Sequence, residues 1–220
     1  MNKSTWNNCK FVFQKSIKMK RALLFAFAIL AMSPAMMAKK KTPPPAPEAS
    51  ATEIHWITDI NELQEKMAKS PRKVYMDIYT DWCGWCKKMD ATTFTNPSVV
   101  KYMNLNYYCF RFNAERQDVM HFQGKEYAFR PDARANALAV ELMMPGGKGQ
   151  MSYPTAILML ENFQSPQPIP GYMTPGQLET IVTYFGDNTY KHEGWDSYSK
   201  THKSTWDNGQ APDMTPPAHH

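Results

Sequence analysis

The segment KVYMDIYTDWCGWCKKMD, residues 73–90, decides the fold of this 220-residue chain. Its first seven residues, 73–79, are rich in β-branched, aromatic and aliphatic side chains and predict a buried strand, in which Asp77 is an unusual member. Two cysteines, Cys83 and Cys86, follow this strand, each directly after a tryptophan. The residues behind them are good helix formers, so we expect a helix that begins at the cysteines.

A cysteine pair at the start of a helix favours thiol–disulfide exchange. The Cys83 sulfur would lie beside unpaired backbone N–H groups at the positive end of the helix dipole, and both features lower the pKa of a thiol. Cys86, one turn further along, would lie on the same side and close enough to form a disulfide. We therefore expect Cys83 to be exposed and acidic, and Cys86 to be shielded and to resolve a mixed disulfide.

Two other roles for the pair stay open, namely a metal site and an inert structural disulfide. A structural zinc site needs four ligands, usually from a second cysteine or histidine pair at close spacing, and Cys109 and the scattered histidines offer none. Met143, Met144 and Met151 could bind Cu(I) as soft thioethers, but methionines at such spacing usually fill a hydrophobic core. We therefore expect no metal and no cofactor.

The N-terminal part of the chain has the layout of a secretory signal peptide. Residues 18–38 carry a basic start, a short apolar run and then small residues, with cleavage expected after Ala35 or Ala38. The apolar run is shorter than the roughly 20 residues that a membrane span needs. We expect residues 1–38 to be a leader and the mature protein to be periplasmic or secreted, without a membrane span. An uncleaved leader that anchors the chain is the alternative.

The charge balance argues against a nucleic-acid partner. The chain has 25 Lys and Arg against 20 Asp and Glu. Six of the basic residues and none of the acidic ones fall in the leader, so the rest of the chain has 19 basic and 20 acidic residues. The net positive charge therefore belongs to the leader and gives no support to nucleic-acid binding.

The remaining sequence divides into a linker, one core region and a tail. Residues 39–51, KKKTPPPAPEASA, predict an extended Pro-rich linker. Residues 52–186 alternate strand and helix patterns and predict an α/β fold, a mixed central β-sheet with helices on both faces, interrupted by an insert over about residues 116–150. Residues 187–220 predict a polar C-terminal tail.

Within this core, capping residues and apolar runs predict the individual elements. We expect helices to follow Asp59, Asn96 and Thr174, because each residue is a good N-cap, and the latter two precede a proline. The remaining predictions are a strand over 107–114, a hairpin over 119–129, a helix over 132–144, a strand over 153–160 and an edge strand over 168–173.

The cysteine segment, together with TTFTNPSVV at residues 92–100, resembles the active-site region of the thioredoxin superfamily. It is similar to the C-terminal domain of DsbD-type electron-transfer proteins and to related small exported proteins. The resemblance covers about residues 52–186 and implies a thioredoxin-like fold. The central dipeptide Gly84-Trp85 departs from the Gly-Pro of thioredoxins, which leaves the redox potential and the choice of partner open.

The resemblance also implies roles for individual residues. Asp77 matches the buried carboxylate beneath the second cysteine, and burial would raise its pKa and suit it to proton transfer. Arg111 falls where a lysine often neighbours that carboxylate. Tyr153 and Pro154 match the family's cis-proline loop, which binds the backbone of a substrate peptide. Gly171 would let such a peptide approach the backbone closely.

The predicted function is therefore thiol–disulfide exchange through a redox-active Cys83–Cys86 disulfide, with Trp82 and Trp85 as an apolar rim for the partner. A reducing or isomerising role is expected from the resemblance. The partners would be protein thiols and disulfides and a redox donor whose identity, membrane-bound or not, stays open, as does the oligomeric state. The alternatives are a binding module with a permanent disulfide and, less favoured, a metal carrier.

Overall fold

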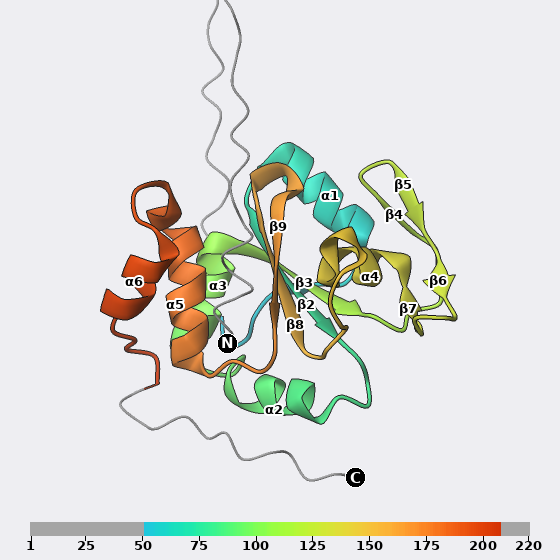
Figure 1. Cartoon of the computed structure of the whole chain (residues 1–220). Helices are drawn as coiled ribbons and strands as arrows, with labels where there is room; N and C mark the ends of the chain where they lie inside the picture. The colour runs from blue at the N-terminus through green and yellow to red at the C-terminus, as the bar shows by residue number, and fades with distance from the viewer. Residues whose placement is uncertain (1–50, 208–220) are drawn as a thin grey trace, which may run out of the picture. The chain divides into compact units, whose positions relative to one another are not determined.

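The computed structural model describes residues 51–207, which form an α/β fold around a five-stranded mixed sheet (Figure 1). The strand order is β1–β3–β2–β8–β9, in which β1, β3 and β2 are parallel and β8 and β9 are antiparallel to their neighbours. The strands are β1 Trp56–Ile57, β2 Lys73–Tyr79, β3 Tyr107–Asn113, β8 Thr155–Leu160 and β9 Gln164–Pro170. The expected leader, the linker up to residue 50 and the tail from residue 208 lie outside the described residues.

Helices cover both faces of this sheet, as predicted (Figure 1). Strand β2 needs a cover on both faces, because its side chains point alternately into two buried clusters. Val74, Met76 and Ile78 belong to one cluster and Tyr75 belongs to the other. A central strand buried on both faces gives the nearly continuous apolar run seen in the sequence. The first cluster includes α1 Ile60–Lys69 and α4 Ala137–Met143, and the second includes α2 Gly84–Thr92, α3 Pro97–Asn106 and α5 Pro175–Gly186.

The helix starts follow the predicted caps. Asp59 caps α1 by accepting a hydrogen bond from the Asn61 N–H at 2.8 Å. Asn96 caps α3 and is followed by a proline in the first turn. Thr174 and Gln177 form a capping box at the start of α5. Such caps use local side-chain contacts, which is why the sequence alone could place them.

The insert forms two small antiparallel sheets, of which only one was predicted. The hairpin consists of β4 Met120–Phe122 and β5 Lys125–Tyr127. A second pair, β6 Phe129–Arg130 and β7 Ala135–Asn136, follows it, and η1 Pro145–Gly147 ends the insert. The helix predicted from residue 132 was wrong over its first five residues, because α4 begins at Ala137. Asn136 caps that helix and also donates from its side chain to the Tyr127 carbonyl at 3.0 Å.

The edge strand β9 begins at Gln164, four residues earlier than predicted. A short turn, η2 Glu161–Phe163, joins it directly to β8. The two strands therefore pair from the residues next to the turn, Leu160 with Gln164. Pro166, Pro168 and Pro170 alternate along this strand. An edge strand tolerates proline because its outer side has no neighbouring strand to receive an N–H group.

The chain continues past α5 through η3 Thr189–Lys191 and α6 Trp195–Thr201 into an extended segment, residues 202–207, which we name the C-terminal strap. The strap packs on α5 through the buried Glu179, whose carboxylate accepts from the Ser204 hydroxyl and the Trp206 N–H at 2.7 and 2.8 Å. The Asp207 carboxylate accepts from the Gly176 N–H at 2.8 Å in the first turn of α5. Part of the expected polar tail is therefore bound to the core.

Candidate active site

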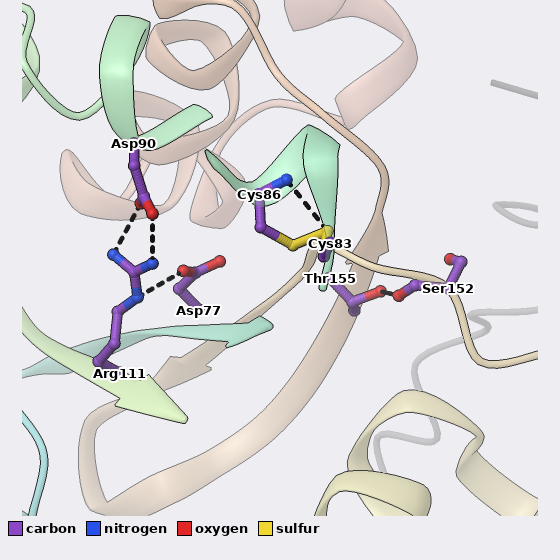
Figure 2. The surroundings of a disulfide bond; sticks show 7 residues. All are labelled: Asp77, Cys83, Cys86, Asp90, Arg111, Ser152 and Thr155. Carbon is purple, nitrogen blue, oxygen red and sulfur yellow. Dashed lines mark hydrogen bonds and ion pairs between the residues drawn. A yellow bond between two sulfur atoms is a disulfide. The ribbon is translucent and has the colours of Figure 1, made fainter. Parts of the chain in front are cut away.

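The two cysteines form a disulfide at the start of α2, directly after the central strand β2 (Figure 2). The chain turns after β2, where the Cys83 N–H donates to the Thr80 carbonyl at 3.1 Å. Cys83 is the N-cap of α2, and its Sγ accepts from the Cys86 N–H at 3.0 Å. The predicted position of Cys83, beside unpaired N–H groups at the positive helix end, is confirmed.

Both cysteines are buried in this disulfide form. The exposed fraction is 4% for Cys83 and 3% for Cys86, so the prediction that Cys83 is exposed was wrong. The disulfide and the N–H group of Cys86 both hold Cys83 Sγ against the first turn of α2, which turns the sulfur away from solvent. A partner can therefore reach Cys83 Sγ only through the small part of Cys83 that is exposed, or after neighbouring side chains move.

A buried carboxylate lies under the disulfide, as predicted. Asp77 is only 2% exposed, and its Oδ2 lies 3.1 Å from Arg111 Nε on the neighbouring strand β3. Figure 2 shows the Asp77 carboxyl group on the side of Arg111 that faces the disulfide. The Oδ1 atom of Asp77 has no hydrogen-bond partner among the described residues. This oxygen is therefore available to exchange a proton with a neighbouring group.

Sequence reasoning missed Asp90, a partly exposed carboxylate on α2 that also pairs with Arg111. Its Oδ2 accepts from Arg111 Nη2 at 2.7 Å, and its Oδ1 lies 2.7 Å from Arg111 Nη1. A signal was present, because Asp90 follows Cys86 by four residues, and positions i and i+4 of a helix share a face. One guanidinium group thus serves two carboxylates.

The balance of these charges leaves Asp77 with a raised pKa of about 7. Burial is the largest cause and raises the pKa, because a desolvated carboxylate is costly. The Arg111 charge lowers it, and the Asp90 charge raises it again. Because the guanidinium group of Arg111 is shared with Asp90, burial outweighs its effect on the pKa of Asp77.

The predicted substrate loop lies beside the cysteines. The Tyr153–Pro154 peptide bond is cis. The Pro154 carbonyl accepts from the Gly171 N–H at 2.8 Å, so these two predicted residues are in contact. Gly171 has a φ of +102°, a conformation that favours glycine. Figure 2 draws Ser152 and Thr155, which flank the Tyr153–Pro154 bond, on the Cys83 side of the disulfide.

The two tryptophans of the motif have different surroundings. Trp82 is 66% exposed, and its ring lies edge-to-face with Tyr153 at 5.7 Å. Trp85 is half-buried and packs on Tyr172 at 5.3 Å, with Lys88 Nζ 5.5 Å from its ring centre. The two rings therefore lie against different loops, and Trp82 is the one that is open to solvent.

Residues 51–207 contain no cluster of three or more His, Cys, Asp or Glu side chains that could hold a metal ion. The same residues contain no helix long and apolar enough to cross a membrane.

A cysteine pair capping the helix after the central strand, a buried carboxylate under it and a cis-proline loop beside it define a thioredoxin-like site. The sequence model of the thioredoxin-like domain matches residues 60–186, more than half of the chain. The chain belongs to this family.

Comparison with individual proteins gives similar relatives over shorter lengths. A thiol:disulfide interchange protein DsbD of Pectobacterium atrosepticum is 36% identical over 55 residues, which cover 25% of this chain and 10% of the relative. The DsbD of Haemophilus ducreyi is 46% identical over 44 residues, 20% of this chain and 8% of the relative. The chain therefore spans about a tenth of the length of these relatives.

Solved structures of thioredoxin-fold proteins resemble this chain as well. A thioredoxin-fold protein from Helicobacter pylori matches with a TM-score of 0.42 and 14% identity, covering 71% of this chain and 89% of that one. The oxidised C-terminal domain of DsbD from Neisseria meningitidis matches with a TM-score of 0.36 and 19% identity, covering 60% of this chain and 98% of that one.

Proposed function

We propose that this protein is a thiol–disulfide oxidoreductase that reduces or isomerises protein disulfides outside the cytoplasm. The observation that carries the proposal is the Cys83–Cys86 disulfide at the N-terminus of α2, above a buried carboxyl group whose pKa is about 7. Membership of the thioredoxin-like family supports the reaction type. The local similarity to proteins named for thiol:disulfide interchange supports it further.

The reaction begins from the reduced pair. The Cys83 thiolate attacks one sulfur of a substrate disulfide, the substrate S–S bond breaks, and one substrate thiolate leaves while a mixed disulfide forms. The Cys86 thiolate then attacks Cys83 Sγ, which releases the second substrate thiolate and forms the Cys83–Cys86 disulfide. Two electrons pass from the protein to the substrate, and each released thiolate takes up a proton.

Two groups of the protein assist these steps. The N-terminus of α2 stabilises the Cys83 thiolate that makes the first attack. Asp77 accepts the proton of the Cys86 thiol as Cys86 becomes a nucleophile, and a pKa of about 7 suits this transfer near neutral pH. In the isomerising direction a second substrate thiolate attacks the substrate sulfur of the mixed disulfide, and the N-terminus of α2 stabilises Cys83 as the thiolate that leaves.

The substrate side is formed by the loops beside the disulfide. We assign Tyr153, Pro154 and Gly171 to binding of an extended substrate backbone, and Trp82 and Trp85 to contacts with its side chains. The contact between Gly171 and Pro154 and the ring contact between Trp82 and Tyr153 support one continuous surface.

An insulin reduction assay with dithiothreitol tests the activity. We expect catalysis by the wild type, none by Cys83→Ser, and a reduction potential in glutathione buffers below that of strong oxidases. The Cys86→Ala variant, expressed in the native compartment, should capture client proteins and the electron donor as mixed disulfides. An inactive wild type would disprove the proposal.

Export is tested by the N-terminus of the purified protein. If residues 1–38 are a cleaved leader, mass spectrometry of the periplasmic or secreted protein should find a chain that begins at Met36 or Lys39. A protein that keeps its first residues and stays with the membrane fraction would favour an uncleaved anchor.

One observation favours a second function, a binding module with a permanent disulfide. Both cysteines are buried, and a buried disulfide is shielded from thiols in solution. Incubation with graded ratios of reduced and oxidised dithiothreitol separates the two functions. Reduction at a potential near that of thioredoxins supports the enzyme, whereas a disulfide that stays oxidised under strongly reducing conditions supports the module.

A further inference from the structure

Trp82 is the most exposed large hydrophobic side chain of residues 51–207 and lies directly before Cys83. Its indole N–H donates to Glu115 Oε1 at 3.0 Å, and its ring contacts Tyr153 in the substrate loop. These two contacts fix the indole between residues that flank the insert, while Trp82 stays 66% exposed. A fixed and exposed aromatic ring beside a reactive sulfur is placed to contact a bound partner.

Two carboxylates lie in the same place. Asn113, the last residue of β3, donates from its side chain to Asp81 Oδ2 at 3.1 Å and accepts the Glu115 N–H at 2.9 Å. One amide therefore holds both acidic residues next to Trp82. We name Asp81, Trp82, Glu115 and Tyr153 the Trp82 surface.

Neither carboxylate of the Trp82 surface has an ion-pair partner within the part of the chain that the structure describes. The nearest basic residue in the sequence, Arg116, is engaged elsewhere, since its Nε donates to Asp118 Oδ1 at 2.7 Å. The surface therefore carries negative charge that no basic side chain of residues 51–207 pairs with.

Other aromatic rings near the site already have a cation from the chain itself. Lys88 Nζ lies 5.5 Å from the ring centre of Trp85 and 5.8 Å from that of Tyr172. Arg111 Cζ lies 4.6 Å from the ring centre of Tyr79. Among residues 51–207, no Lys or Arg side chain lies over Trp82. The exposed ring with two adjacent carboxylates is thus complementary to a cation from outside.

We propose that the Trp82 surface binds a lysine or arginine side chain next to the reacting cysteine of the client protein, a specificity that rests on the proposed function. A guanidinium group can stack on an indole face while its edge donates to a carboxylate, and both contacts are absent for an acidic or small side chain. Glu115 and Asp81 are specificity-determining residues in this interaction and take no part in the sulfur chemistry.

Peptide binding tests this proposal without turnover. Two fluorescein-labelled peptides are compared by anisotropy on the oxidised protein, identical except for Arg or Glu beside a serine that replaces the cysteine. We expect about five- to twenty-fold tighter binding of the Arg peptide at low salt, from one exposed cation–π contact and one surface ion pair. The preference should shrink in 1 M NaCl, where charges are screened over roughly 3 Å.

Single substitutions test whether the preference for the Arg peptide comes from the Trp82 surface. Glu115→Gln keeps an acceptor for the Trp82 indole and removes only the charge, so the Arg-to-Glu ratio should fall several-fold, and further with Asp81→Asn. Glu126→Gln, the same change at an exposed position on the insert hairpin, should keep the ratio. Equal binding of both peptides, or an unchanged ratio in Glu115→Gln, overturns the proposal.

A kinetic arm separates this proposal from the proposed function. The reduced protein is mixed with disulfide-linked peptides that carry Arg, Ala or Glu beside the cysteine. If all three peptides are reduced at the same rate, the protein is an oxidoreductase but the proposed preference for a basic side chain is wrong. If the Arg peptide binds selectively but no peptide is reduced, the proposed oxidoreductase function is wrong and the Trp82 surface is a binding surface for basic side chains.

Discussion

Asp77 and Arg111 lie opposite one another on the parallel strands β2 and β3, with 3.1 Å between Asp77 Oδ2 and Arg111 Nε. An ion pair of this kind normally keeps a carboxyl group charged at neutral pH. Here the same guanidinium group contacts both oxygens of Asp90, and Asp77 is fully buried. The result is a carboxyl group poised to change its protonation state close to pH 7.

Replacing Asp77 with Asn should stabilise the protein at alkaline pH. The folded-state pKa of about 7 exceeds the ordinary value of 3.8, so the folded protein binds the proton more tightly than the unfolded chain does. The stability linked to this proton is complete below pH 4 and is lost as the pH rises through 7. Asp77→Asn should therefore raise the free energy of unfolding at pH 8 by up to about 4 kcal/mol and change it little at pH 4. Urea unfolding at several pH values measures this, and a gain independent of pH would contradict it.

Replacing Asp90 with Asn should shift the titration of Asp77 to lower pH. The Asp90 charge raises the pKa of Asp77, and its removal also leaves the Arg111 charge to Asp77 alone. The pH dependence of the Cys86 resolving step, followed by rapid mixing with a peptide disulfide, should move in the acid direction. Asp132→Asn, at an exposed position of the insert, is the matched control. An unchanged or alkaline-shifted profile would show that Asp90 does not tune Asp77.

Replacing Glu179 with Gln should release the C-terminal strap. The Glu179 carboxylate accepts from Ser204, Trp206 and both the N–H and the hydroxyl of Thr205. A glutamine keeps one acceptor oxygen and turns an NH₂ group toward these donors, which should cost about 2–3 kcal/mol locally. Trypsin should then cut after Lys203 at least ten times faster than in the wild type. Glu65→Gln on the exposed face of α1 should leave the cutting rate unchanged, and equal rates for both variants would contradict the expectation.

Cys109 should stay unreactive while the active-site pair reacts. It lies in the buried strand β3, and burial raises the pKa of its thiol although the Arg72 charge opposes the rise. Brief iodoacetamide treatment of the reduced native protein, followed by mass spectrometry, should find label on the active-site pair and almost none on Cys109. Denaturant should make Cys109 react as well. Labelling of Cys109 at a similar rate in the folded protein would show that β3 opens readily.

Much of the fold could be predicted because its signals are local. The apolar run of β2, the caps Asp59, Asn96 and Thr174, and the cysteine spacing each act through residues within a few positions of one another. The same reasoning failed between residues 132 and 136. There the β6–β7 pairing, and the hydrogen bond from Asn136 to Tyr127, override a pattern that is helical by composition.

The amino-acid sequence by itself determined where α1, α3 and α5 begin, that residues 73–79 form a buried strand and which two cysteines form the pair, since these depend on neighbouring residues. Only the tertiary structure decided what surrounds the pair. It buried Cys83, divided the Arg111 charge between Asp77 and Asp90, and brought Trp82 against Glu115 and Tyr153. These contacts join residues from separate strands and loops, and the register of the sheet and the packing of the insert set their distances, which no local pattern encodes.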